Sequence, residues 1–194
     1  LRDKALKAID DTTFYPAKGK ERIKSMIETR PDWCVSRQRV WGVPLPIFIS
    51  KKNGEILIDD DVFENIAKIY EKEGSDCWFE ENFQRLLGDK YKAEDFTKSS
   101  DIVEVWFDSG STHSFVLEKR EDLKWPASMY LEGSDQHRGW FHSSLLESCG
   151  TRGRAPFESI LSHGFVVDGK GLKMSKSTGN VIAPEDILKK YGAD

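Results

Sequence analysis

The sequence has few cysteines, and their spacing excludes two common kinds of small-domain scaffold. Cys34, Cys77 and Cys149 are the only three cysteines, and no two of them form a C-x-x-C pair. An odd and widely spaced set does not build a disulfide framework, and it lacks the paired ligands of a structural zinc site. We therefore expect free thiols, no protein-bound zinc or other metal, and a reducing, cytoplasmic location.

Long apolar runs and a strong excess of one charge are also missing. No apolar stretch approaches the roughly 20 residues that span a bilayer, and the first residues do not form a signal sequence. The 33 acidic and 29 basic side chains give a formal net charge of -4, which provides no broad basic field for non-specific nucleic-acid binding. We expect a soluble protein with no membrane partner, in which any contact with RNA is local.

The most informative segment of the chain is a lysine-containing loop between glycines. Lys173 and Lys176 bracket small hydroxyl residues, with Gly169 and Gly171 before them and Gly179 after. Glycine permits unusual backbone angles, and ammonium and hydroxyl groups donate hydrogen bonds to phosphate oxygens. The loop therefore either binds a polyphosphate or is a solvated surface turn, and the rest of the sequence must decide between the two.

Helical and extended patterns alternate along the chain. Apolar residues at helical spacing predict helices at residues 3–9, 18–29, 59–72, 79–87, 138–149 and 184–190. Short apolar runs predict strands at residues 45–49, 56–58, 103–107 and 129–131 and within residues 159–167. An Asn-Gly turn at Asn53 favours a hairpin between the first two of these strands. After residue 101 strands alternate with helices, which indicates an α/β unit with a parallel sheet.

Polar residues follow the predicted strand at residues 129–131. Glu132, Gly133, Asp135 and Gln136 stand between this strand and the next predicted helix. Ligands of open α/β sheets bind beyond the carboxyl ends of strands, where the free N–H groups of a helix also point. The two carboxylates suit ribose hydroxyls or an ammonium, and the amide both donates and accepts. The same turn is also compatible with a helix capped by an aspartate.

Two further positions at predicted strand ends suggest a site. His163 and Gly164 end one strand, where the histidine either faces a base or phosphate or has a structural role. Trp106 ends another, where it either walls an apolar pocket or packs in the core. Each position is ambiguous when it is considered alone.

Taken in order, several segments resemble the isoleucyl-tRNA synthetases, a family of class I aminoacyl-tRNA synthetases, and more specifically their bacterial type. The segments are residues 30–39, 41–44, 105–110, 131–141, 163–165 and 173–177. The resemblance implies the second half of a Rossmann-like, parallel-sheet nucleotide-binding domain of the α/β class, with an inserted α+β lobe. It divides the chain into a return connection from an editing domain (residues 1–49), an acidic insertion lobe (50–98) and the C-terminal half of the catalytic domain with the lysine loop (99–194).

The resemblance also implies roles for individual residues. The residues implied to contact the aminoacyl-adenylate are Glu132, Gly133, Asp135, which would bind the ribose, and Gln136, with Trp106 and Trp140 lining the pocket for the isoleucine side chain. Those implied to bind ATP are His163, Gly164, Val166 and Lys176, and the catalytic residues would be Lys173 and Lys176. The implied reaction joins isoleucine to ATP, which enters with Mg²⁺, and then transfers the isoleucyl group to tRNA(Ile). The whole enzyme is expected to be a monomer.

The sequence departs from the family in one respect. No His-Ile-Gly-His tetrad occurs in residues 1–194, and the chain begins at Leu1 rather than at methionine. We therefore expect a fragment of a longer enzyme with weak or no adenylate formation of its own. Two alternatives stay open, a valyl- or leucyl-tRNA synthetase and a non-catalytic module that binds an adenine nucleotide or tRNA.

Overall fold

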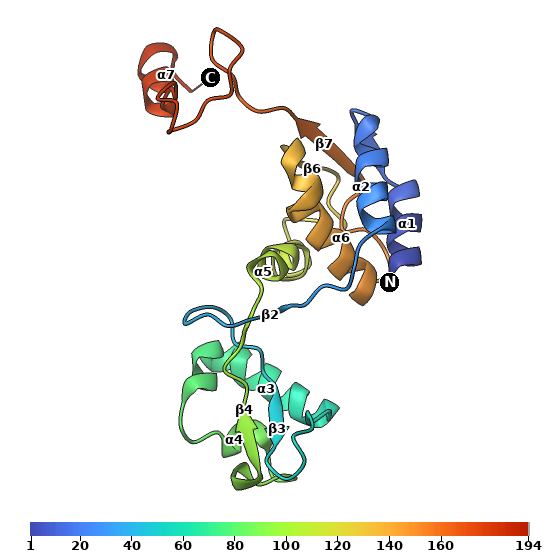
Figure 1. Cartoon of the computed structure of the whole chain (residues 1–194), viewed down its shortest axis with the longest axis vertical. Coiled ribbons are helices and arrows are strands. Elements are labelled where there is room, and N and C mark those ends of the chain that lie inside the picture. The colour runs from blue at the N-terminus through green and yellow to red at the C-terminus, as the bar shows by residue number, and fades with distance from the viewer. Residues whose placement is uncertain (194) are drawn as a thin grey trace. The chain divides into compact units, whose positions relative to one another are not determined.

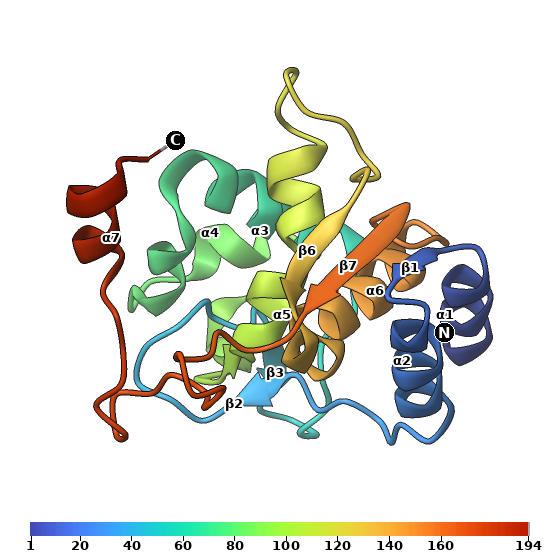
Figure 2. The ribbon, with the colours of Figure 1, turned by 90° about the horizontal axis from the view of Figure 1, so that it is seen from above.

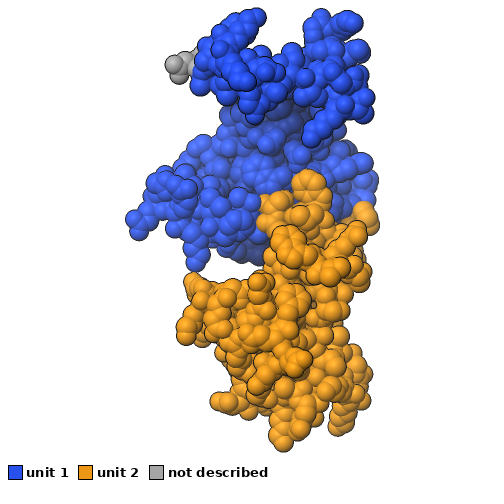
Figure 3. Space-filling view, turned by 90° about the vertical axis from the view of Figure 1, so that its left-hand side faces the viewer, with its two compact units in different colours: residues 1–30, 110–194 blue, residues 31–109 orange. Residues whose placement is uncertain are grey.

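The computed structural model describes residues 1–193, which fall into two compact units (Figure 1 and Figure 3). The first unit combines residues 1–30 with the chain from Gly110 onward, and the second comprises residues 31–109. The boundaries between these units differ from those that the sequence suggested at residues 49/50 and 98/99. The three-part division therefore stays a prediction.

A parallel sheet organises the first unit, as the alternation of strands and helices predicts. Its strands lie in the order β1 (Thr13–Tyr15), β7 (Ser159–His163) and β6 (Tyr130–Gly133), with β7 parallel to both neighbours. The helix α6 (Trp140–Thr151) joins β6 to β7 and lies against the sheet (Figure 2). Parallel strands need such a crossover connection, because the chain must return to the starting end of the sheet before the next strand begins. A tight turn joins only antiparallel strands.

Helices of the first unit bury apolar side chains against α6 and against one another. The helix α1 (Arg2–Asp10) packs on α2 (Lys18–Glu28) and on α6. The most buried side chains of this core are Ala5, Ile9, Ile23, Ile27, Phe141, Leu145, Phe157 and Ile160. A π-helical turn (His113–Leu117) precedes β6, and α7 (Pro184–Tyr191), which has no buried residue, follows the lysine loop. Burial of these apolar side chains stabilises the sheet from which the polar turns project.

The second unit is a small α+β lobe with its own core. The helices around its core are α3 (Asp60–Glu73) and α4 (Gln84–Leu87), with 3-10 turns at Ser75–Phe79 and Ala93–Asp95. Its antiparallel pairs are β3 (Phe48–Ser50) with β4 (Phe96–Lys98) and β2 (Ser36–Arg37) with β5 (Ile102–Val103). The core contains Phe48, Val62, Ile66, Cys77, Trp78, Leu86, Leu87 and Phe96. The side chain of Asp59 accepts from the Asp61 N–H and caps α3, as the pattern predicts.

The predicted hairpin around Asn53 forms its turn and a short antiparallel pairing, although residues 56–58 do not make a regular strand. Gly54 has φ +73° and donates from its N–H to the Ser50 carbonyl, and Ile49 forms an isolated antiparallel bridge to Ile56. No strand forms at residues 56–58, and the ladder partner of Phe48–Ser50 is β4. The local segment still pairs with β3, since the Ser50 N–H donates to the Glu55 carbonyl and the Leu57 N–H donates to the Phe48 carbonyl, each at 2.9 Å.

Two predicted elements are wrong. The strand predicted at residues 103–107 ends at Val103, and α5 (Val105–Gly110) follows. The reason is Glu104, whose Oε2 accepts from the Trp106 N–H at 3.1 Å while its carbonyl accepts from the Phe107 N–H at 2.8 Å. The single helix predicted at residues 79–87 is also interrupted, because Glu80 is extended (φ -62°, ψ 145°).

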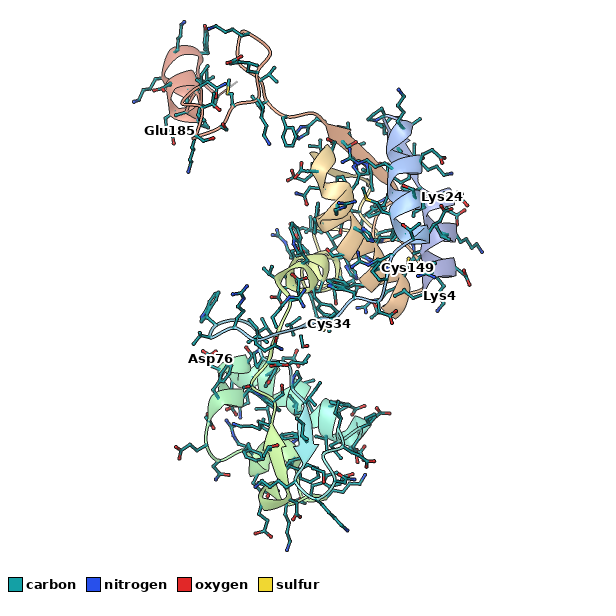
Figure 4. All side chains as sticks on the ribbon, viewed as in Figure 1. Lys4, Lys24, Cys34, Asp76, Cys149 and Glu185 are labelled. Atoms are coloured by element: carbon teal, nitrogen blue, oxygen red, sulfur yellow. The ribbon has the colours of Figure 1, made fainter. Side chains whose placement is uncertain are left out.

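The structure shows the state of the cysteines, the length of the helices and the grouping of possible metal ligands. The three cysteines are free thiols, of which Cys149 is buried on α6 and Cys34 is exposed (Figure 4). In residues 1–193 no helix has both the length and the apolar character to cross a bilayer. Within that same range no three His, Cys, Asp or Glu side chains gather as metal ligands do.

Candidate functional site

The carboxyl ends of β6 and β7 bring three of the predicted site residues together. The parallel register pairs Gly133 with His163. A Cβ atom on Gly133 would lie 2.5 Å from Asp135 Oδ1 and 3.9 Å from His163 Cε1. The carboxylate therefore folds back over the end of β6 into the space that glycine leaves, beside the imidazole.

Gln136 fixes this carboxylate relative to α6. Its Nε2 donates to Asp135 Oδ2 at 3.0 Å, and its Oε1 accepts from the Trp140 N–H at 2.9 Å. Trp140 begins α6, where the first N–H groups have no partner within the helix. One amide side chain thus joins the helix start to an exposed carboxylate, which leaves acceptor positions for a ligand. Glu132 extends the polar edge, since its Oε2 accepts from the Gly133 N–H at 3.2 Å.

Trp140 lies flat on Tyr130, a residue that the sequence did not single out. The two rings are parallel within 3°, with centroids 4.0 Å apart. The Tyr130 hydroxyl lies 3.2 Å from Ser144 Oγ, and burial raises the pKa of Tyr130. The stacking holds the half-buried indole in one orientation, as a pocket wall requires. Neither spacing nor residue type pairs these two positions in the sequence, so no signal could have identified Tyr130.

The lysine loop after β7 forms a small hairpin. Val167 forms an antiparallel bridge to Lys173, the Met174 N–H donates to the Val166 carbonyl at 3.0 Å, and Gly171 at the turn has φ +77°. Lys173 Nζ lies 3.5 Å from the centroid of the Phe165 ring, a cation–π contact. The loop thus has a defined backbone.

The other lysine of the loop has a different environment. Lys176 is exposed, and its ammonium forms no ion pair or hydrogen bond within residues 1–193. Gly164 and Val166 are exposed too and lie in the segment that leads from β7 into the loop. An exposed, unpaired ammonium can move toward an anion without breaking an existing contact.

Trp106 lies in the second unit, whereas Trp140 lies in the first. Trp106 belongs to α5 and is 43% exposed, so it is not a core aromatic. The pocket that was predicted between the two tryptophans stays a prediction.

Two residues without a predicted role organise the loop. Asp168 and Asn180 are joined by a hydrogen bond of 2.9 Å from Asn180 Nδ2 to Asp168 Oδ2. A signal for Asp168 does exist, because an aspartate before Gly-Lys-Gly is typical of a side chain that bonds to the turn after it.

Comparison with known proteins agrees with this arrangement. A family model described as "tRNA synthetases class I (I, L, M and V)" matches residues 1–194. The "Isoleucine--tRNA ligase" of Pelagibacter ubique (strain HTCC1062) is 86% identical over 194 residues, which are 100% of this chain and 21% of the relative. That of Brucella abortus (strain 2308) is 60% identical over 195 residues, 100% of this chain and 20% of the relative. The chain thus spans about a fifth of the length of these curated relatives.

A solved structure supports the fold. Methionyl-tRNA synthetase of Mycobacterium tuberculosis, in complex with methionyl-adenylate, has a TM-score of 0.56 at 20% identity, over 98% of this chain and 29% of that one. This likeness confirms the Rossmann-like α/β class, and the relatives confirm the resemblance to isoleucyl-tRNA synthetases. Because the family model covers every residue, the chain belongs to the class I tRNA synthetases of the isoleucine, leucine, methionine and valine group.

Proposed function

We propose that this chain is the part of an isoleucine-activating enzyme that binds the aminoacyl-adenylate and supplies the mobile lysines. The observation that carries the proposal is the meeting of Gly133, Asp135 and His163 at the carboxyl ends of two neighbouring parallel strands. Ligands of such sheets bind at this edge. The identity of 86% to an isoleucine ligase supports isoleucine as the amino acid.

In the proposed complex the turn after β6 holds the nucleoside. The Asp135 carboxylate accepts from the ribose hydroxyls, and Gln136 keeps that carboxylate in place through the hydrogen bond described above. The absence of a side chain at Gly133 leaves room for this carboxylate at the strand end. His163, Gly164 and Val166 flank the adenine and phosphate side, and Trp140 borders the isoleucine side chain.

The proposed first step is attack by isoleucine on ATP. An oxygen of the amino acid carboxylate forms a bond to the α-phosphorus of ATP, which enters with Mg²⁺, and the bond from that phosphorus to pyrophosphate breaks. Negative charge grows on the phosphate oxygens in the transition state, so ammonium groups that close at that moment lower the barrier. Lys176 is free to do so, and Lys173 does so when it leaves the Phe165 ring.

In the second step the terminal ribose hydroxyl of tRNA(Ile) attacks the acyl carbon and AMP leaves. Neither step needs a nucleophile from the protein. The proposal includes a monomeric enzyme in the cytoplasm, which agrees with the free thiols.

The test uses the full-length Pelagibacter ubique relative with its matching segment replaced by residues 1–194, here called the chimera. We expect isoleucine-dependent exchange of pyrophosphate into ATP, and much less exchange with leucine, valine or methionine. Replacing Lys176→Ala should lower kcat by about 100-fold, because one donor to developing charge is lost. Binding of a non-hydrolysable isoleucyl-adenylate analogue should not change, because the analogue lacks pyrophosphate.

Two results would overturn the proposal. One is unchanged exchange in the Lys176→Ala chimera, and the other is a preference for an amino acid other than isoleucine. Binding of the analogue by the chimera, measured first, establishes that the transplanted segment is folded.

A further inference from the structure

We propose that Asp168 and Asn180 form a clamp that positions Lys173 and Lys176 for phosphate chemistry. The inference rests on the proposed function and adds two positioning residues to it. Neither side chain is offered as a contact to substrate. The clamp acts by fixing the backbone on which the two lysines stand.

Asp168 holds the turn before the lysines. Its Oδ1 accepts from the Lys170 N–H and from the Leu172 N–H, each at 2.9 Å. Its Oδ2 accepts from Asn180 Nδ2 at 2.9 Å. Hydrogen bonds from Asn180 and from the two backbone N–H groups lower the pKa of Asp168, so it is the ionised carboxylate that makes these bonds at neutral pH.

Asn180 reaches the backbone beside both lysines. In addition to its bond to Asp168, its Nδ2 lies 3.3 Å from the Lys173 carbonyl, to which it donates. Its Oδ1 accepts from the Ser175 N–H at 3.0 Å, one residue before Lys176. One planar amide therefore joins the start of the loop, its first lysine and the residue next to its second lysine.

A turn at Ser175 returns the chain to Asn180. Ser175 Oγ lies 2.6 Å from Thr178 Oγ1, and the Gly179 N–H donates to the Ser175 carbonyl at 3.1 Å. Gly179 has φ +70°, a conformation that L side chains rarely adopt. The segment from Lys173 to Asn180 is thus closed on itself, and the two ammonium groups project from a fixed frame.

The position of the loop backbone matters because it determines which points the ammonium group of a flexible lysine side chain can reach. Displacement of a catalytic group by about 1 Å can cost on the order of 100-fold in rate. Loss of the clamp should therefore lower kcat without weakening the binding of an adenylate, which has no pyrophosphate for the lysines to contact.

The test is a double-mutant cycle at the clamp in the chimera. The variants are Asn180→Asp, Asp168→Asn and the double replacement, together with Asn180→Ala. Asn180→Asp sets one carboxylate against another, and Asn180→Ala removes the amide, so each should lower the kcat of pyrophosphate exchange by about 10- to 100-fold. In the double replacement the amide and the carboxylate exchange places, so a donor again faces an acceptor between positions 168 and 180. The bond to the Lys173 carbonyl is not restored, because a carboxylate at position 180 cannot donate to it, so the recovery should be partial. Both new side chains also keep an oxygen that accepts from the backbone N–H groups.

The double variant should therefore recover part of the kcat lost in Asn180→Asp, by about threefold or more, which the two single replacements do not predict by simple addition. The KM for isoleucine and the binding of the adenylate analogue should stay within about twofold in every variant, since they report uniform binding. Asn53→Ala is the matched control, because Asn53 also makes turn hydrogen bonds from an exposed amide, to Glu55 in the second unit. This control should keep the full kcat.

Any of three results would overturn the proposed clamp. Asn180→Ala could keep the full kcat of pyrophosphate exchange, the double replacement could have the same kcat as Asn180→Asp, or the affinity for the analogue could decrease together with kcat. Lys176→Ala distinguishes failure of the clamp from failure of the proposed function. If Lys176→Ala lowers exchange and the clamp variants do not, only the clamp is wrong. If Lys176→Ala also leaves exchange unchanged, the proposed function is wrong, and the clamp, which rests on it, is wrong as well.

Discussion

At the scale of single residues, Gly133 is a position where a missing side chain makes room for a functional one. Its backbone angles, φ -62° and ψ 153°, are open to any residue, so glycine is not needed for conformation. It is needed for space, since a Cβ atom would come within 2.5 Å of Asp135 Oδ1. The atom in the way is the end of a flexible side chain, so a substitution should move Asp135 rather than unfold the sheet.

We therefore predict that Gly133→Ala in the chimera weakens binding of the isoleucyl-adenylate analogue by about tenfold or more, because the ribose loses a charge-assisted hydrogen bond. The melting temperature should change little. Gly150→Ala is the matched control, since a Cβ atom there meets only Leu1 Cδ1 at 3.8 Å and the helix gains a better former. Equal analogue affinity in the two variants would contradict this account of Gly133.

His142 is a second residue with a measurable consequence, although it lies away from the site. The ring is 4% exposed in α6, and neither nitrogen meets a partner in hydrogen-bonding geometry within the described residues. Burial lowers the pKa of His142 from 6.5 to about 4, the charges of Arg30 and Arg138 act in the same direction, and the His137 carbonyl opposes them. Between about pH 4 and pH 6.5 the ring is therefore neutral in the folded state and protonated in the unfolded chain.

The sign of the pH dependence follows from this difference. The contribution of His142 is complete above pH 6.5 and is lost as the pH falls toward 4, because only the unfolded state takes up a proton in that window. We predict a loss of about 2 to 3 kcal/mol in the free energy of unfolding over this range. His142→Leu should flatten the dependence and change the stability at pH 8 by little, since an apolar side chain replaces a neutral, buried ring. Thermal unfolding of the chain between pH 4 and 8 measures this, and an equally steep loss in the variant would refute it.

At the scale of elements, the sequence was most informative where periodicity was long or turn chemistry was specific. The helices α1, α2 and α3 were predicted within one residue at each end, because each places apolar side chains on one face over several turns. The helix α6 was predicted within two residues at each end, although it is buried on every side from Phe141 to Cys149 rather than on one face. The strands β6 and β7 were also predicted, and with them the polar turn that contains Asp135. The edge of the sheet that carries the site was therefore predictable.

Elements that depend on a tertiary contact were not predictable. The run from Val103 to Phe107 is apolar and aromatic enough for a strand, yet the buried carboxylate of Glu104 caps a helix there and lies 3.9 Å from Arg37 Nη2. Glutamate is not among the usual capping residues, so local rules do not predict a helix start at this position. The Asp168–Asn180 bond likewise joins residues twelve positions apart in a loop without periodicity.

At the scale of the whole molecule, the chain contains two hydrophobic cores rather than one. The core of the second unit is built entirely from residues of that unit, and its largest buried side chain is Trp78, at 1% exposure. Trp78 Nε1 donates to the Ser99 carbonyl at 3.0 Å, and the ring of Phe48 lies 4.9 Å away. The two ends of the unit are tied together, since β2 pairs with β5.

A segment that buries its own core and pairs its own ends should fold without the rest of the chain. We predict that residues 31–109, expressed alone, unfold in urea in one cooperative transition, with tryptophan fluorescence and far-ultraviolet circular dichroism giving the same midpoint. Trp78→Ala should abolish the transition, because truncating a buried tryptophan costs about 3 to 5 kcal/mol, and a domain this small has little more than that to lose. Trp41→Ala, at a side chain that is 90% exposed, should leave the midpoint unchanged. Non-coincident midpoints, or a gradual loss of signal in the unsubstituted segment, would mean that this unit depends on the remainder of the chain for its fold.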